Sequence, residues 1–296
     1  MGAGADAVPL DSRFVAIISD IHIPLPWSEQ KYRTGREYPW IIDTVKRHIA
    51  EILACNPRPA RVISLGDMSI AFGETREYVL LRELLKPLYD AGIEVTLAMG
   101  NHDIRAEFLQ SFPEYAAKSL VPGRFVYKVE TPDLDFLVLD SLKEPTKRGS
   151  YAAVTGSELG KAQMDWLQET LKTQAKPTIV CAHHSAQELK LVKLLTLSPH
   201  VFGYLHGHHH HWMTNLLFPD YRDNAPSIRS VGVGSFGIDR DVGYALLRTA
   251  PTFAQLKVVA KDYYFPGPLP REKRPPLWDD SIRDAAPRKF RFPFAK

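Results

Sequence analysis

The sequence predicts a layered α/β fold in which two mixed β-sheets pack face to face with helices outside them, a four-layer sandwich. Short apolar segments alternate with amphipathic helical segments from residue 14 to residue 205, which is the pattern of a layered α/β domain. From residue 212 to residue 260, four strand-like segments follow with no helical segment between them, which predicts one antiparallel edge. The composition agrees, because 45% hydrophobic and 24% charged residues in a chain of 296 are ordinary for a globular protein.

The first half of the chain supplies three predicted strands and three predicted helices. Pro39 suits the first turn of a helix because its φ is fixed near the helical value. Thr75 is the predicted N-cap of the second helix, and Gly92 is its predicted stop. The expected elements are, in order, strand 14–19, helix 39–54, strand 61–65, helix 75–90, strand 93–98 and helix 104–112.

The second half begins with a predicted hairpin and continues with strands. Ser157 is placed to open an amphipathic helix, and apolar segments follow it. The expected elements are strands 125–130 and 135–140, helix 157–172, and strands 178–182 and 201–205.

The chain divides at about residue 262. Residues 1–261 carry the predicted catalytic domain, and residues 262–296 form a proline-rich basic extension, expected to run extended over the surface or to be partly disordered. Residues 271–296 hold eight Lys and Arg against four acids, a charge of +4, which leaves 29 basic against 30 acidic residues, or −1, for the rest. Phe290, Phe292 and Phe294 in this extension predict docking, onto an acidic partner or onto a second copy of the chain in a homo-oligomer.

Three observations predict a cytoplasmic protein that is not embedded in a membrane. The two cysteines, Cys55 and Cys181, are too few to staple a chain of this size, so a reduced compartment is expected. No segment approaches the roughly 18 apolar residues that span a bilayer, and residues 1–13 lack the pattern of a signal peptide.

The residues that carry chemistry follow predicted strands. Asp-x-His follows the first strand, Gly-Asp the second and Gly-Asn-His-Asp the third, while two histidine blocks follow later strands. The active sites of layered α/β proteins lie beyond the carboxyl ends of their strands. The donors are Asp20 and His22, Asp67, Asn101 with His102 and Asp103, His183 and His184, and His208 and His210.

This donor set predicts a dinuclear metal centre. Imidazole and carboxylate together suit zinc, manganese or iron, and no thiolate is present to favour a structural zinc site. The donors exceed the need of one ion and match two ions that share a bridging carboxylate. Two divalent or trivalent ions about 3.5–4 Å apart clamp a phosphoryl group and activate water, so the residues predict a metal-dependent hydrolase of a small phosphoester.

The order of these blocks, from Asp20 to His210, resembles the calcineurin-like metallophosphoesterase superfamily. Further segments resemble its class III cyclic-nucleotide phosphodiesterase branch. They are Arg82-Glu83-Leu84-Leu85, Gly100-Asn101-His102-Asp103-Ile104-Arg105, Leu139-Asp140-Ser141, Glu158-Leu159-Gly160 and Trp166-Leu167.

The resemblance implies a role for each residue of the blocks. Asp67 would bridge two ions, and a hydroxide between them would attack phosphorus. His102 would contact the phosphate or protonate the leaving oxygen, and Asp103 would orient His102 or a ligand. The implied ligands are Asp20, His22 and His210 for one ion, and Asn101, His183 and His208 for the other.

Three assignments have an alternative. Family spacing favours His183 over His184 as the ligand, which leaves His184 to contact substrate or to support a ligand. Arg105 is expected either to bind a substrate phosphate through two hydrogen bonds or to be a solvated helix residue. The loop over residues 23–38, with Lys31, Arg33 and Arg36, is either a lid or a solvated loop.

The function predicted from these observations is hydrolysis of a phosphodiester, with a cyclic nucleotide as the first substrate. The alternatives are a phosphomonoesterase, a nuclease and a non-catalytic scaffold of the same fold. The near-neutral body argues against a nuclease, which would need a basic groove, and the complete ligand set argues against a scaffold.

Overall fold

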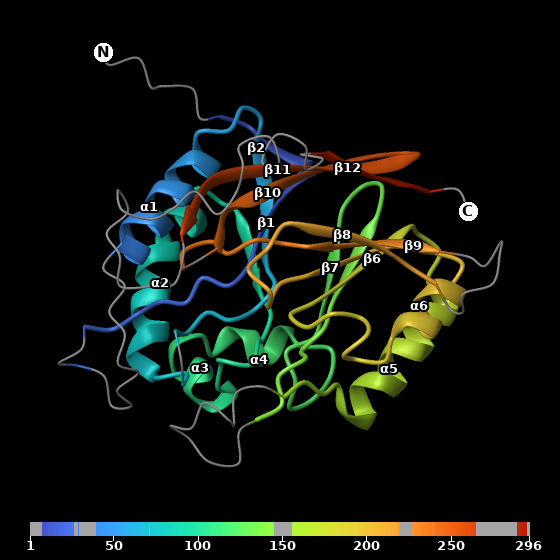
Figure 1. The fold of residues 1–296 in the computed structure, drawn as a ribbon, viewed down its shortest axis with the longest axis horizontal. Helices are drawn as coiled ribbons and strands as arrows, with labels where there is room; N and C mark the ends of the chain where they lie inside the picture. Colours follow the sequence, from blue (N-terminus) through green and yellow to red (C-terminus); the bar gives the residue numbers. More distant parts are fainter. Residues whose placement is uncertain are drawn as a thin grey trace.

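Two six-stranded sheets lie face to face, with helices on both outer faces (Figure 1). This arrangement, seen in a computed structural model, confirms the predicted fold class. The structure describes residues 8–26, 29, 40–70, 72–144, 156–218, 227–238, 240–264 and 289–294.

The first sheet combines three parallel strands from the start of the chain with three antiparallel strands from its end. Its strand order is β12-β11-β10-β1-β2-β3. The end of β1, from Val15 to Ile18, is fully buried, as expected for a central strand covered on both faces. The strands are β1 (Leu10–Ile18), β2 (Arg58–Ser64), β3 (Glu94–Leu97), β10 (Arg240–Ala250), β11 (Phe253–Tyr264) and β12 (Lys289–Pro293).

The second sheet has the order β4-β5-β6-β7-β9-β8, and β5, β6, β7 and β9 in it are parallel. The expectation that residues 212–260 form one antiparallel edge is wrong, because β8 and β9 join this sheet while β10 and β11 join the first. The first sheet therefore has one antiparallel edge, and the second has two, at β4 and at β8. The strands are β4 (Tyr127–Glu130), β5 (Asp135–Val138), β6 (Thr178–Ala182), β7 (Val201–His206), β8 (Met213–Leu217) and β9 (Ile228–Gly232).

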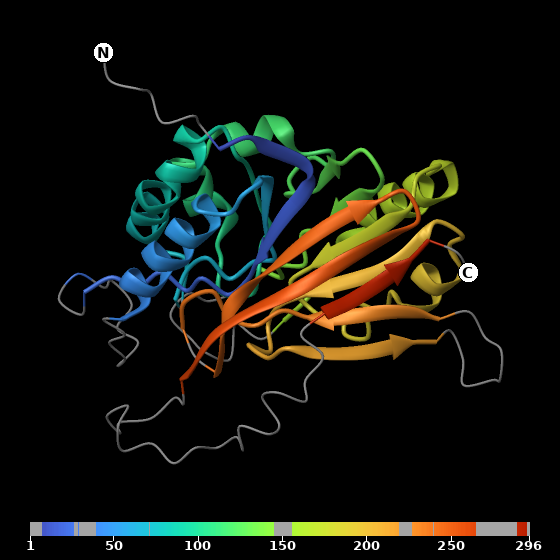
Figure 2. The ribbon, with the colours of Figure 1, turned by 90° about the horizontal axis from the view of Figure 1, so that it is seen from above.

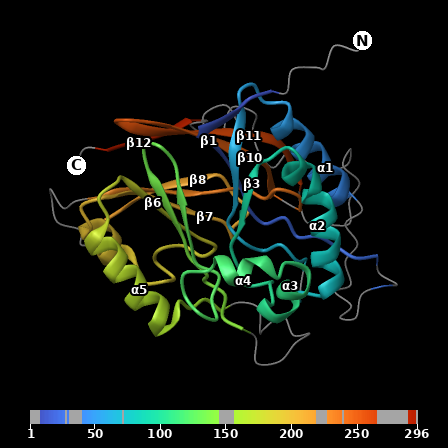
Figure 3. The same ribbon diagram turned by 180° about the vertical axis from the view of Figure 1, so that it is seen from behind.

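Helices α1 and α2 cover the first sheet, and α5 and α6 cover the second (Figures 1 and 3). The sequence analysis missed α4 and α6, which have only 5 and 6 residues. In the described part of the chain no helix is both long and apolar enough to cross a bilayer. The helices are α1 (Trp40–Leu53), α2 (Thr75–Asp90), α3 (Arg105–Ser111), α4 (Glu114–Lys118), α5 (Gly160–Thr173) and α6 (Val192–Leu197).

Two helix starts differ from the prediction. The N-cap of α2 is Glu74 rather than Thr75, and Glu74 and Glu77 form a reciprocal capping box. Helix α5 begins at Gly160, because Ser157 forms an isolated β-bridge with Leu142 instead of capping the helix. Both helix starts depend on contacts with other residues, which the N-cap preference of a single residue does not predict.

The end of the chain returns to the first sheet. Strand β12 pairs antiparallel with β11 (Figure 2), so the expectation that residues 262–296 run over the surface is wrong for 289–293. Phe290 and Phe292 are buried in the core. The ring of Phe292 occupies the space beside Gly203 of β7, where an added Cβ would lie 2.5 Å from it. Phe292 therefore packs the first sheet against the second.

Further expectations for these segments stay predictions. The division at residue 262 lies inside β11 and stays a prediction, as does an oligomer formed through the extension. Lys31, Arg33 and Arg36 of the expected lid are not among the described residues.

We predict that Phe292→Ala lowers the free energy of unfolding by about 3–5 kcal/mol, because it leaves a cavity between the two sheets. Urea denaturation followed by circular dichroism measures the change. Lys289→Ala is the matched control on the same strand; its side chain is exposed, so a change within about 0.5 kcal/mol is expected. Equal effects of the two substitutions would contradict the packing role.

We predict a pH-dependent difference in stability between the protein and Glu77→Gln. Burial raises the pKa of Glu77 to about 8, despite hydrogen bonds from Ser69 and from the backbone of Glu74. Above the unfolded pKa, the folded state holds a proton that the unfolded state has lost. Stability from this group therefore falls as the pH rises from about 4.5 to 8, by roughly 1.4 kcal/mol per unit.

Glu77→Gln removes this titration while its amide oxygen can still accept both hydrogen bonds. The variant should gain stability relative to the parent as the pH is raised from 5 to 8, measured by urea denaturation at each pH. Parallel pH profiles for the two proteins would contradict a raised pKa of Glu77.

Candidate metal centre

The carboxyl ends of five strands from the two sheets meet at one place. The loops after β1 and β2 pair through a hydrogen bond from the His22 amide to the Asp67 carbonyl, at 3.0 Å. The two sheets are joined where the His208 amide donates to Oδ2 of Asp20, at 3.1 Å. The strand ends thus gather the predicted ligands, which are Asp20, His22, Asp67, Asn101, His183, His208 and His210.

Most of these residues have a left-handed backbone, which costs roughly 1–2 kcal/mol for a residue with a side chain. Strand β1 ends at Ile18, so the side chains of Asp20 and His22 are directed by the turn that follows the strand and not by strand alternation. The neighbouring turn is equally constrained, because a Cβ on Gly100 would lie 2.1 Å from Oδ1 of Asp67. The left-handed residues are Asp20, His22, Asp67, His208 and His210, with φ between 51° and 71°.

Asp20, His22 and His210 form the first donor group, in which all ligand atoms lie within 4.8 Å of one another. Nε2 of His210 lies 3.1 Å from Oδ1 of Asp20 and 3.2 Å from Nε2 of His22. Nδ1 of His22 lies 2.9 Å from the carbonyl oxygen of Ser69. A carbonyl only accepts, so this nitrogen carries the hydrogen, and in the neutral ring Nε2 presents a lone pair to the group.

The second donor group is built around His183. Its Nδ1 donates to the carbonyl of Leu65 at 3.1 Å, so in the neutral ring its Nε2 also presents a lone pair. That Nε2 lies 3.1 Å from Oδ2 of Asp67 and 3.0 Å from Oδ1 of Asn101. Oδ2 of Asp67 is in turn 3.6 Å from Nε2 of His22. Asp67 therefore stands between the two donor groups.

His184 and His208 lie beside the second group, and with His183 they form another set of ligand atoms within 4.8 Å. The ring centroids of His184 and His208 are 4.7 Å apart. Burial is the main cause that lowers the pKa of His184 to about 2 and that of His208 to about 4. Both rings are therefore neutral near pH 7.

The two carboxylates are buried yet ionised. Burial alone would raise the pKa of Asp20 and of Asp67, but the nearby histidines lower both below their ordinary value, His210 for Asp20 and His183 for Asp67. In return, although burial opposes it, Asp67 raises the pKa of His183 to about 9. The carboxylates thus keep the His183 ring protonated and positively charged.

This arrangement fits metal ions. Carboxylate oxygens and imidazole lone pairs face one another in a buried space, and such acceptors need a proton or a cation between them. A metal cation would supply the charge that otherwise sits on His183 and would leave its ring neutral for coordination. Nitrogen and oxygen donors without thiolate suit manganese, iron or zinc.

His102 and Asp103, the two residues for which a catalytic role was predicted, have different surroundings in the structure. The His102 side chain is 18% exposed, and its Nε2 lies 4.0 Å from Oδ2 of Asp67. Asp103 is fully buried and accepts hydrogen bonds from Tyr78 and from the Met68, Ser69 and Gly100 amides. Its carboxyl therefore holds the loop after Asp67, an arrangement consistent with the predicted role of orienting a ligand.

Arg105 is an ion-paired side chain, unlike either alternative drawn from the sequence. Its Nε and Nη2 donate to the two carboxylate oxygens of Asp140, both at 2.7 Å, and Nη2 also donates to the Leu142 carbonyl at 2.6 Å. The side chain is only 13% exposed. The two N–H groups that could bind a phosphate together already donate to Asp140. This disfavours the predicted contact with a phosphate through two hydrogen bonds.

The remaining histidines stand outside the ligand set. His211 lies 3.3 Å from a carboxylate oxygen of Asp241, and the ring of His209 lies against His206 and His208. Cys181 is fully buried in β6, as a core residue would be.

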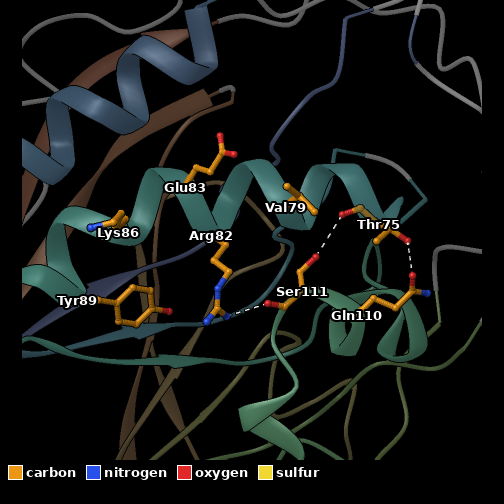
Figure 4. A pocket seen from close by; sticks show the side chains of 8 residues that line it. All are labelled: Thr75, Val79, Arg82, Glu83, Lys86, Tyr89, Gln110 and Ser111. Carbon is orange, nitrogen blue, oxygen red and sulfur yellow. Dashed lines mark hydrogen bonds between the residues drawn. The ribbon is translucent and has the colours of Figure 1, made fainter.

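An open groove of about 730 Å³ lies between α2 and α3 (Figure 4). Arg82 donates to the Ser111 carbonyl there and pairs with Glu114, while Lys86 pairs with Asp90. These cations are already neutralised, and no predicted site residue lines the groove, so it is separate from the metal centre. The lining residues are Thr75, Val79, Arg82, Glu83, Lys86, Tyr89, Gln110 and Ser111.

Three supporting residues were not assigned roles from the sequence. Ser19 donates to Oδ2 of Asp20 at 2.5 Å, Tyr78 donates to Asp103, and the Ser141 hydroxyl lies 2.9 Å from Nδ1 of His184. Ser19 directly precedes Asp20, and Ser141 stands in the quoted segment Leu139-Asp140-Ser141; these are the signals that could have found them. Tyr78 lies on α2, 25 residues before Asp103 in the sequence, where no local pattern marks it.

Comparisons with known proteins agree with this geometry. Residues 15–212 match the family described as calcineurin-like phosphoesterase. A cAMP/cGMP dual specificity phosphodiesterase of Mycobacterium tuberculosis is 34% identical over 129 residues, 43% of this chain and 37% of that protein. A probable cyclic nucleotide phosphodiesterase of Rhodococcus erythropolis is 29% identical over 138 residues, 46% of this chain and 42% of that protein. The matches thus span less than half the length of these relatives.

Among solved structures, a dimetal phosphatase from Danio rerio has the same fold. It superposes with a TM-score of 0.61 at 15% identity and covers 86% of this chain and 96% of its own. Since the family match extends over two thirds of the sequence, from β1 to the last histidine block, the chain belongs to the calcineurin-like phosphoesterase family.

Proposed function

We propose that this chain hydrolyses a phosphodiester in a metal-dependent reaction, with a cyclic nucleotide as its first substrate class. The observation that carries the proposal is the position of Asp67, whose buried carboxylate faces Nε2 of His183 at 3.1 Å and Nε2 of His22 at 3.6 Å. A carboxylate between two sets of nitrogen lone pairs is suited to bridge two cations.

Each donor group would hold one ion. Two bound metal ions would supply a nucleophile from water and neutralise charge on the phosphoryl group. The proposed ligands are Asp20, His22 and His210 for one ion and Asn101, His183 and His208 for the other, with Asp67 shared.

His102 is the proposed proton donor. Its amide donates to Oδ1 of Asp67 at 2.9 Å, which fixes the residue beside the bridge, while its partly exposed ring remains within reach of a substrate. An imidazole there can hydrogen-bond a phosphoryl oxygen or protonate the leaving oxygen, since its pKa in water lies near neutrality.

Two observations favour a small phosphodiester. The relatives that match at 34% and 29% identity are both named as cyclic nucleotide phosphodiesterases. Residues 1–270 carry a charge of −1, unlike the basic groove that a nuclease needs. The predicted cytoplasmic location and the identity of the metals remain predictions.

We predict that protein freed of metal regains activity on addition of manganese, iron or zinc. The assay compares an aryl phosphodiester, an aryl phosphomonoester and a panel of cyclic nucleotides. Asp67→Asn should lose bound metal, measured by elemental mass spectrometry, and lose more than about 100-fold in kcat/KM, since even partners of metal ligands contribute about 10–100-fold. Asp165→Asn, an exposed carboxylate on α5, is the control and should keep both.

The outcomes separate the alternatives. Turnover of the monoester alone would replace the phosphodiesterase with a phosphomonoesterase, and cleavage of nucleic acid alone would favour a nuclease. No turnover with any metal would leave a non-catalytic scaffold.

We predict that Arg105→Gln lowers the free energy of unfolding by about 3–5 kcal/mol, because it leaves the carboxylate of Asp140 buried without its partner. Arg76→Gln removes an exposed ion pair with Glu29 and should cost less than about 1 kcal/mol. Urea denaturation measures both. A tenfold rise in KM for Arg105→Gln with unchanged stability would instead restore its predicted contact with substrate.

A further inference from the structure

The neighbouring histidines His183 and His184 have opposite hydrogen-bonding environments. Nδ1 of His183 meets the Leu65 carbonyl, which can only accept. Nδ1 of His184 meets the hydroxyl of Ser141 at 2.9 Å, which can donate or accept. The direction of this second hydrogen bond decides which nitrogen of His184 carries the hydrogen.

The Ser141 hydroxyl settles that direction because its other partner is a donor. The backbone amide of His184 donates to Oγ of Ser141 at 3.4 Å. Ser141 is fully buried, and among the described residues its hydroxyl has no further partner. If Nδ1 were also a donor, the hydroxyl hydrogen would be buried without an acceptor, at a cost of about 1–3 kcal/mol.

The hydroxyl therefore donates to Nδ1 of His184, and the ring hydrogen is on Nε2. A ring that accepts at Nδ1 is neutral, and with its hydrogen on Nε2 it has no lone pair there for a metal. His183, with the opposite assignment, directs Nε2 at Asp67 and Asn101, and in the neutral ring that atom has the lone pair that a metal needs. The hydrogen bonds thus separate a ligand from a non-ligand within one His-His pair.

Ser141 is held rigidly in this position. One side chain of α5, Gln163, accepts from the Asp140 amide at 2.9 Å and donates to the Asp140 carbonyl at 2.8 Å. The carboxylate of the same Asp140 is fixed by Arg105 at 2.7 Å. Backbone and side chain of the residue before Ser141 are both fixed, so the hydroxyl cannot easily turn away from His184.

Nε2 of His184 is then a hydrogen-bond donor without an acceptor. It is buried and has no partner in the described structure, although His184 is only 1% exposed. One ring nitrogen of His184 lies within 4.8 Å of ligand atoms of His183 and His208, so the ring borders the place where the substrate of the proposed reaction would bind. An anionic oxygen there would accept a hydrogen bond from Nε2.

We infer that Ser141 sets His184 as an Nε2–H donor that binds a phosphoryl oxygen of the substrate and is not a metal ligand. This inference rests on the proposed function, since it places the phosphoryl group at the metal centre. His184 is the substrate contact, and Ser141 is a positioning residue that acts through it.

The test uses His184→Gln and His184→Leu in the zinc-loaded, full-length protein, with inorganic phosphate as the probe. A glutamine amide can place an N–H near the position of Nε2, whereas leucine has no donor. We expect both variants to keep the metal content of the parent, measured by elemental mass spectrometry. By calorimetry, His184→Leu should bind phosphate about tenfold more weakly or worse, because hydrogen bonds to charged groups are the stronger class, and His184→Gln should recover most of the loss.

The role of Ser141 is tested by locating the hydrogen on the imidazole ring of His184. In protein labelled with ¹⁵N at histidine, two-bond proton–nitrogen correlations should show hydrogen on Nε2 of His184, and Ser141→Ala should weaken this preference and reduce phosphate affinity a few-fold. Ser185→Ala is the matched control, because that hydroxyl donates to Glu188 and not to His184.

Each outcome decides the inference. Loss of metal in both His184 variants would make His184 a ligand, and equal phosphate affinity in His184→Leu and the parent would leave it a structural residue. A hydrogen on Nδ1 would overturn the role of Ser141. If the parent binds neither zinc nor phosphate, the proposed function fails instead, so the two failures are distinguishable.

Discussion

The architecture of this protein depends on keeping buried carboxylates charged. Asp20 and Asp67 sit where burial opposes ionisation, and histidines from the other side of the site keep both ionised. The largest contributions, from His210 and His183, come from loops that follow strands of the other sheet, so the charge balance depends on the packing of the two sheets. Folding and assembly of the site are therefore one event.

Backbone strain is concentrated at the same place. Five left-handed residues lie at the strand ends, and hydrogen bonds between neighbouring loops hold them there, such as the one from the His22 amide to the Asp67 carbonyl. Strain of this kind persists where the surroundings over-determine the conformation. The turn at Gly100, which has no room for a side chain beside Asp67, is part of the same constraint.

The sequence predicted the fold class and gathered the ligands because both depend on local patterns: apolar segments give the strands, and polar blocks mark their ends. It could not predict the partner of Arg105, since Asp140 reaches it from another sheet segment 35 residues away. Strand β12 was missed because proline around it suggested an extended chain, although Phe290 and Phe292 alternate with charged residues as strand residues do. The hydrogen on His184 depends on a three-dimensional contact that spacing does not encode.

The return of β12 to the first sheet has a consequence for synthesis on the ribosome. Strands β4 to β9 lie within residues 127–232, so the second sheet can form while its segment is still the newest part of the chain. The first sheet is completed later. Its strand β1 pairs with β10, more than 220 residues further along the chain, and the edge of the sheet is completed only by residues 289–293. Pairing of such distant segments is slow, and until it occurs the apolar strand β1 lacks its neighbour on one side, although β2 can pair with it on the other. The newly made chain would thus pass through a stage at which one half of the sandwich is formed and the other still requires protection from aggregation.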